Sequence, residues 1–294
     1  PALRDRLEVI EFPGYSEEEK FRIAKNFLMP KLYKDHGIKK KALVFQDTAL
    51  TDVVQKHTRE AGVRDLERQL ATIIRKVTRK LVESPSTKTV TITRDSIHKY
   101  LGPVKYTHQL AETKDEVGVV TGLAWTPVGG EVLFIEVAKM PGKGKLIITG
   151  QLGSVMRESA QAALSFARAY SARHGAKEDM NKQDIHIHVP SGAIRKDGSS
   201  AGVAITTALV SLLLGKPARK DVAMTGEVTL RGKVLEIGGV KEKILAAHRA
   251  GIKTIVMPTE NKKDLEDIPP EVKKDLKFFF AKTMDDALKT ALKF

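Results

Sequence analysis

Cysteine is absent from this sequence of 294 residues, and aromatic side chains are few, with one tryptophan and five tyrosines. Without cysteine the chain can form neither a disulfide nor a thiolate metal site, which excludes the disulfide-rich secreted class. The uncharged run Ala201–Gly215 contains Ser and Thr and is shorter than the roughly 18 apolar residues that a membrane span requires. No basic segment followed by an apolar one opens the chain. We therefore expect a soluble, cytoplasmic protein with no membrane partner.

Positive charge is in excess, with 50 Lys and Arg against 36 Asp and Glu and a formal net charge of +14. Such a charge attracts polyanions, so one hypothesis is a basic nucleic-acid-binding module without catalytic activity. The charges are interspersed, however, and few aromatic side chains are available to stack on bases. We favour a lysine-rich solvated surface and keep DNA as a partner to be tested.

The length allows two domains, each with its own buried core. Gly102 and Pro103, followed by polar residues, have the composition of a linker. We therefore predict one domain over residues 1–104 and a second over residues 105–294. The first residue is a proline, so we expect the chain to be a piece of a longer protein.

Residues 1–104 are predicted to be mainly helical. Ser16–Glu19 forms a capping box ahead of periodic apolar residues, and Pro30 is predicted to end that helix. A second amphipathic helix begins near Arg64, carries an Arg- and Lys-rich outer face, and is closed by Pro85. Thr89–Thr93 alternates as a short strand.

Strands and helices mix from about residue 118 onward, so we predict an α+β protein whose second domain is mixed α/β. The predicted strand regions are Val132–Ala138, Leu146–Thr149, Asp184–Val189, Val222–Ile237 and Ile252–Met257, and the predicted helices are Ser154–His174, Ala201–Leu214 and Val240–Ala250.

A polar, glycine-punctuated loop at Arg195–Gly202 opens directly into an apolar helix. Ser200 would lie at the helix N-terminus, where free backbone N–H groups favour negative charge. Three interpretations remain open from the residues alone. The loop could be an ordinary helix start capped by Ser199 or Ser200, an anion-binding site, or the site of a nucleophilic serine beside an oxyanion.

The same loop matches the G-x-S-x-G pattern of α/β-hydrolases, but that pattern follows a strand at once, and here Pro190 ends the strand well before the serine. The only histidine after Ser200 is His248, for which we expect a partly buried core position. A serine without a histidine partner can use a lysine whose pKa burial has lowered. Lys243 shares a helix face with small apolar residues, and Lys241 lies beside Ile244 and Leu245, so spacing alone selects neither.

His186 and His188 alternate onto one strand face, as a metal-binding pair would, but no third ligand is evident. We interpret them as structural and expect no metal site.

Three segments, Asp197–Gly202 (DGSSAG), Thr225–Gly232 (TGEVTLRG) and Ile237–Lys243 (IGGVKEK), together closely resemble the Lon family of ATP-dependent proteases in order and spacing. The resemblance implies a serine endopeptidase in which Ser200 is the nucleophile and Lys243 is its base.

It further implies that Thr225 hydrogen-bonds the lysine and that the backbone after Asp197 supplies the oxyanion environment. Two positions depart from the family pattern, because Ser199 and Arg195 stand where prolines are usual.

The resemblance extends upstream. Arg4–Ile10 looks like the arginine-finger segment, with Arg6 as the finger, and Gly62–Arg68 looks like the sensor-2 helix, with Arg64 facing nucleotide. No G-x-x-x-x-G-K-[ST] phosphate loop occurs in the sequence. The implied architecture is the helical lid of an AAA+ ATPase joined to a protease domain.

By resemblance the full-length protein would use ATP and magnesium, form a homohexamer and degrade unfolded polypeptides. The fragment alone is expected to bind no cofactor.

Overall fold

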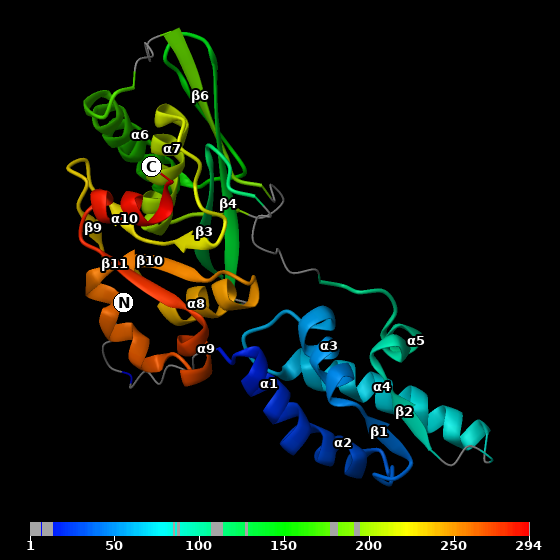
Figure 1. Ribbon diagram of the computed structural model, residues 1–294. Coiled ribbons are helices and arrows are strands. Elements are labelled where there is room, and N and C mark those ends of the chain that lie inside the picture. The colour runs from blue at the N-terminus through cyan, green and yellow to red at the C-terminus, as the bar shows by residue number, and fades with distance from the viewer. Residues whose placement is uncertain are drawn as a thin grey trace. The chain divides into compact units, whose positions relative to one another are not determined.

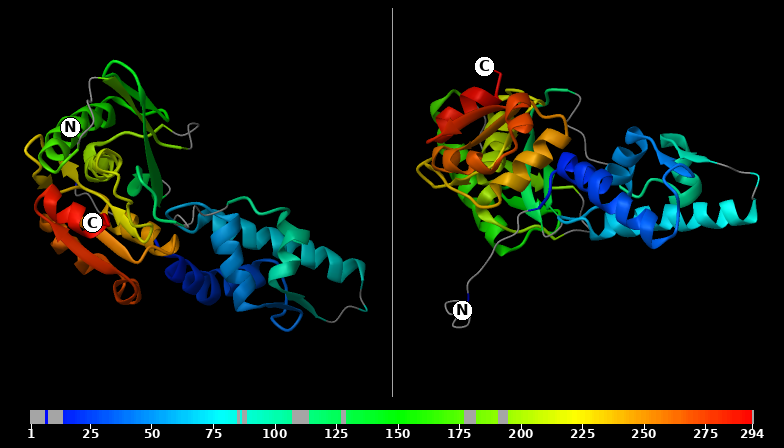
Figure 2. Two further views of the ribbon diagram at one scale, coloured as in Figure 1. Left: turned by 45° about the horizontal axis from the view of Figure 1, so that its top comes forward. Right: turned by 90° about the horizontal axis from the view of Figure 1, so that it is seen from below.

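The computed structural model describes residue 7 and residues 14–84, 86, 89–106, 114–126, 129–176, 182–190 and 195–293. The chain divides into two compact units, chiefly between residues 108 and 109 (Figures 1 and 2). The first is mainly helical and the second mixes helices with a sheet, so the predicted α+β class is confirmed. Within the described residues no helix is long and apolar enough to cross a membrane.

Helices around one apolar core make up the first unit. The long amphipathic helix predicted near Arg64 buries its apolar side chains in this core, and its exposed face carries arginine and lysine. Two short strands pair in parallel, with Leu43 opposite Val90. The elements are α1 (Glu17–Ile23), the π-helical turn η2 (Ala24–Leu28), α2 (Met29–Asp35), β1 (Leu43–Phe45), α3 (Asp47–His57), α4 (Arg64–Glu83), β2 (Val90–Ile92), η3 (Arg94–Ser96) and α5 (Ile97–Leu101).

The first helix corrects the sequence prediction. Its capping box at Ser16 and Glu19 forms as expected, with each side chain bonded to the other residue's backbone. Pro30, however, does not end the helical segment, because the chain passes through a π turn at Ala24–Leu28 and continues as α2. The wider π turn leaves room for the proline ring, which would clash with a carbonyl of the preceding turn in a regular α-helix. Pro85, predicted to close α4, lies outside the described residues.

A seven-stranded sheet in the order β11-β10-β7-β3-β4-β6-β5 organises the second unit. Strands β3, β7, β10 and β11 are parallel, and β4 runs antiparallel to β6. The strands are β3 (Val119–Thr126), β4 (Gly129–Pro141), β5 (Leu146–Thr149), β6 (Gln183–His188), β7 (Val222–Met224), β10 (Thr254–Pro258) and β11 (Lys277–Ala281), with a separate pair formed by β8 (Glu227–Val228) and β9 (Val234–Leu235). The helices are α6 (Ser154–Arg173), the 3₁₀ turn η5 (Ser199–Ala201), α7 (Gly202–Leu214), α8 (Val240–Arg249), the 3₁₀ segment η6 (Thr259–Asp267), α9 (Pro270–Asp275) and α10 (Met284–Ala291).

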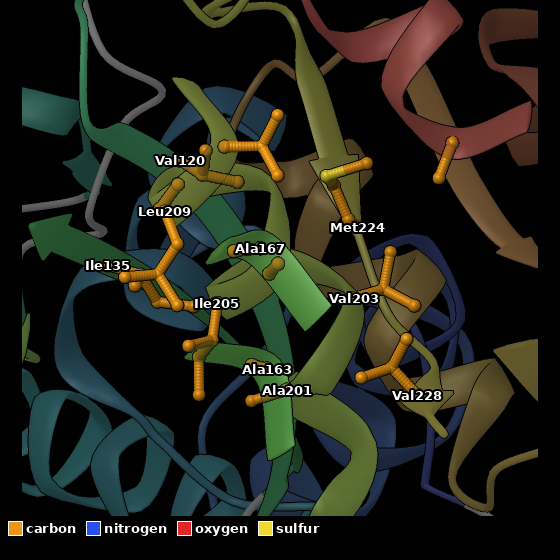
Figure 3. Close-up of a cluster of buried hydrophobic side chains, with 14 of the residues drawn as sticks. Val120, Ile135, Ala163, Ala167, Ala201, Val203, Ile205, Leu209, Met224 and Val228 are labelled. Carbon is orange, nitrogen blue, oxygen red and sulfur yellow. The ribbon is translucent and has the colours of Figure 1, made fainter. Parts of the chain in front are cut away.

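The sheet separates two apolar cores. Successive residues of a strand point to opposite faces, so Met224 enters the core formed with α6, α7 and α10, whereas Ala223 enters the core formed with α8 and α9. Figure 3 shows the first core, where Val203 and Ile205 of α7 lie among side chains from the sheet and α6. Helices α7 and α8 therefore begin on different faces of one sheet.

Candidate active site

The turn that carries Ser200 is tied by hydrogen bonds to the segment after strand β7. The Ser200 carbonyl accepts the Gly226 N–H at 2.8 Å and the Thr225 hydroxyl at 3.3 Å. The Ser199 hydroxyl donates to the carboxylate of Glu227. Three consecutive residues, 225–227, thus hold the 3₁₀ turn that leads into α7.

Asp197 binds the start of helix α6. Its Oδ1 accepts the N–H of Met156, the third residue of that helix, at 3.0 Å, and also accepts the N–H of Gly198 at 2.9 Å. The carboxylate approaches so closely that a Cβ at Gly153 would lie 2.1 Å from Oδ2, so a glycine is required there. Asp197 therefore caps α6, and the Gly198 N–H, which belongs to the expected oxyanion environment, is already bonded to this carboxylate.

Lys196 fixes the other side of the loop. Its side chain is buried, and its ammonium donates to the Gly150 carbonyl at 3.1 Å and to the Val189 carbonyl at 3.5 Å. Burial lowers the pKa of Lys196. The residues before Ser200 are thus anchored to the ends of strands β5 and β6.

Lys243 lies in the α8 core and is 2 % exposed. The small apolar residues predicted to enclose it are all buried, namely Val240, Ala246, Ala247 and Ala250. Burial lowers its pKa to about 8, against a smaller opposing effect of the Glu242 charge. Its Nζ donates to the Gly238 carbonyl at 2.9 Å. Lys241, the alternative lysine, is half-buried.

Strand β3 lies against both the Ser200 turn and helix α8. Strands β3 and β7 are parallel, with Gly122 opposite Met224, so the residues that follow β7 are level with the end of β3. At that end Trp125 lies against Gly239, which has a φ of +67° and begins α8. The two candidate residues are therefore presented at the same carboxyl edge of the sheet, the edge at which parallel sheets bind ligands.

Within the part of the chain that the structure describes, no hydrogen bond joins the Ser200 hydroxyl to Lys243, and none joins Thr225 to Lys243. Thr225 bonds the Ser200 carbonyl and Lys243 bonds the Gly238 carbonyl instead. Catalytic hydrogen bonds are often long before substrate binds. The roles of Ser200, Lys243, Thr225 and Asp197 stay predictions.

The two histidines of β6 bracket one hydroxyl. Thr149 Oγ1 lies 2.8 Å from His186 Nε2 and 2.7 Å from His188 Nδ1. Among the described residues, no group of three or more His, Cys, Asp or Glu side chains could hold a metal ion. The structural interpretation of the pair thus stays a prediction, with Thr149 as the partner that the sequence did not indicate.

The nucleotide-sensing predictions are placed only in part. Arg6 lies outside the described residues. Arg64 is the exposed first residue of α4, and the neighbouring N–H groups of Asp65 and Leu66 donate to the Glu60 carboxylate at 2.9 and 2.8 Å. Its role stays a prediction. His248, expected at a partly buried core position, is partly buried and pairs with Asp275 at 2.8 Å.

Comparison with protein families accounts for nearly the whole chain. Residues 91–294 match the Lon protease (S16) C-terminal proteolytic domain. The chain belongs to the Lon protease family. Residues 34–90 match the Lon protease AAA+ ATPase lid domain, so the predicted order of a Lon lid followed by a Lon-type serine protease domain is confirmed.

Similar full-length proteins include the Lon protease of Dictyoglomus thermophilum, 54% identical over 293 residues that cover 99% of this chain and 37% of that protein. The Lon protease of Geobacter metallireducens is 55% identical over 99% of this chain and 35% of its own length. Lon protease 1 of Bacillus subtilis is 53% identical, with coverage of 99% and 38%. The chain thus spans little more than a third of the length of these curated relatives.

The domain boundary predicted after residue 104 stays a prediction. The two family matches meet at residues 90 and 91, whereas the compact units divide at residues 108 and 109.

Sequence reasoning missed one residue that contacts the candidate site. Glu227 bonds the Ser199 hydroxyl, belongs to the TGEVTLRG segment and could have been found there.

Proposed function

We propose that this Lon-family chain hydrolyses peptide bonds with a Ser200–Lys243 dyad. The observation that carries the proposal is the burial of Lys243, which lowers its pKa to about 8, so that about a tenth of it is neutral at pH 7. A neutral amine can accept the proton of a serine hydroxyl, which a solvated lysine with a pKa of about 10.4 does rarely.

In the first half-reaction, neutral Lys243 takes the Ser200 hydroxyl proton while Oγ attacks the peptide carbonyl carbon. Backbone N–H groups of the turn after Gly198 stabilise the oxyanion, because those of Gly198, Gly202 and Val203 are already bonded within the protein. The intermediate then collapses, the C–N bond breaks, and the Lys243 ammonium returns its proton to the leaving amine.

The acyl-enzyme on Ser200 is hydrolysed by the same groups. Neutral Lys243 removes a proton from water as the water oxygen attacks the ester carbonyl, and the ammonium then protonates Ser200 Oγ as it leaves. The Thr225 hydroxyl donates to the Ser200 carbonyl and so helps to fix the turn on which the nucleophile lies.

For the full-length protein we propose an ATP- and magnesium-dependent homohexamer that degrades unfolded polypeptides in the cytoplasm. Arg6 and Arg64 would contact nucleotide held by a part of the protein outside this chain. The matching lid domain supports this proposal. DNA binding stays a prediction, for which a salt-dependent gel shift is the test.

The dyad is tested with the fluorogenic cleavage of an unstructured peptide and with fluorophosphonate labelling. We expect Ser200→Ala and Lys243→Met to lower kcat by at least about 10³-fold. Lys241→Met is the matched control on the same helix and should retain most of the activity. Turnover in the Ser200→Ala variant, or loss in Lys241→Met with activity in Lys243→Met, would contradict the assignment.

A further inference from the structure

Asn261 is a buried polar residue outside every motif discussed above. It is 2 % exposed and lies in η6, three residues beyond the end of β10. Its Oδ1 accepts the N–H of Ile237 at 3.1 Å, and its Nδ2 donates to the Ile237 carbonyl at 2.8 Å. The same Nδ2 donates to Asp264 at 2.6 Å, which fixes the orientation of the amide.

The residue that Asn261 holds directly precedes the one that binds Lys243. Both backbone polar groups of Ile237 are bonded to a single side chain, so the position of the next peptide unit is constrained. The carbonyl of that unit, at Gly238, accepts the Lys243 Nζ at 2.9 Å. A neutral lysine that donates one N–H to this carbonyl keeps its lone pair for a proton from another group.

We propose that Asn261 is a positioning residue for the candidate base, holding Ile237 so that the Gly238 carbonyl orients the Lys243 amine toward the Ser200 proton. This inference rests on the proposed Ser200–Lys243 dyad. An apolar side chain at this position would leave the Ile237 N–H and carbonyl without these bonds, so Asn261 also contributes to stability. The tests below therefore include readouts that a purely structural role would not move.

Two variants separate the contacts. Asn261→Ala removes all three hydrogen bonds and adds no charge. Asn261→Asp keeps the shape and the acceptor for the Ile237 N–H, but a carboxylate has no hydrogen for the Ile237 carbonyl or for Asp264. We expect kcat for an unstructured peptide to fall by on the order of 100-fold in either variant, with KM within about twofold of the wild type.

The second measurement needs no turnover. The side-chain ¹³Cε and ¹⁵Nζ NMR signals of Lys243, assigned with Lys243→Arg, are titrated against pH in the 294-residue chain. Burial is the main cause of the low Lys243 pKa, so loosening the start of α8 in Asn261→Ala should admit water and raise the pKa above about 8. Inactivity of the wild type itself would count against the dyad, whereas the titration would still report on Asn261.

Ser211→Ala is the matched control, since Ser211 is also fully buried and also bonds two backbone groups, those of Gly118 and Lys216, at the far end of α7. It should lower stability with kcat and the Lys243 pKa unchanged. A double variant, Asn261→Asp with Asp264→Asn, restores only the contact between these two side chains. Recovery of kcat in that double variant, or wild-type kcat in Asn261→Asp together with an unshifted pKa in Asn261→Ala, would overturn the proposal.

Discussion

The turn that carries Ser200 is partly exposed and is held by hydrogen bonds, whereas the helix that carries Lys243 is held in an apolar core. The carboxylate of Glu227 accepts a hydrogen bond from the Ser199 hydroxyl in the turn. The carboxylate of Asp197, just before the turn, accepts one from the N–H of Met156 in α6. Among the described residues, the Lys243 ammonium donates one hydrogen bond, to the Gly238 carbonyl. A nucleophile needs a backbone of defined geometry, which hydrogen bonds provide, and an amine base needs a low pKa, which burial provides.

The largest expected effect is the cost in stability of burying the Lys243 ammonium. If burial of Lys243 carried no such cost, the contrast between the two regions would fail. Below pH 8 the folded protein holds a buried ammonium. Between about pH 8 and 10.5 the folded lysine loses its proton before the unfolded one does, so wild-type stability rises relative to that of a Lys243→Met variant. We expect the variant to be more stable by about 3 kcal/mol at pH 7, a difference that shrinks toward pH 10.5.

Urea unfolding of both proteins at pH 7, 9 and 10.5 measures this difference. Lys241→Met should stay within about 0.5 kcal/mol of the wild type throughout, because Lys241 is only half-buried. If the stabilities of the wild type and Lys243→Met changed with pH in parallel, burial would not be what lowers the pKa of Lys243.

The Ser200 turn should respond instead to the loss of a polar contact. Asp197→Ala removes the cap of α6 and should lower the free energy of unfolding by about 1–2 kcal/mol. Gly153→Ala should act in the same way, because its methyl group would displace the Asp197 carboxylate. In the double variant the clash is gone, so its loss of unfolding free energy should be smaller than the sum of the two single losses. Strict additivity in thermal and chemical unfolding would contradict this account of Gly153.

The smallest effect sharpens the distinction between the two adjacent serines. Ser199→Ala removes one hydroxyl that donates to Glu227 and should change kcat less than about fivefold, whereas Ser200→Ala should abolish turnover. Peptide cleavage and fluorophosphonate labelling measure both variants. Labelling that persists in Ser200→Ala and disappears in Ser199→Ala would exchange the roles of the two residues.

Much of the fold could be predicted from local patterns. The helix at α4 and the strand at β5 have strong periodicity or bounded apolar runs, and both form where predicted. Strands β3 and β11 were missed, since β3 reads as a run of small and apolar residues with two glycines nearby and β11 carries three consecutive phenylalanines without alternation. Pro30 misled the prediction because a π turn, which no local rule indicates, accommodates it.

The sequence by itself determined the family, the order of lid and protease domain, and the identity of the candidate residues through three ordered motifs. Only the tertiary structure decided which lysine is buried, because Lys241 and Lys243 both lie beside apolar residues on a helical wheel and the sheet covers only one of these faces. It also decided that Asp197 caps α6 through the N–H of Met156, 41 residues earlier, and that Asn261 holds a backbone segment 24 residues before it. Periodicity reports on neighbours within a few residues, whereas these contacts join segments that only the completed sheet brings together.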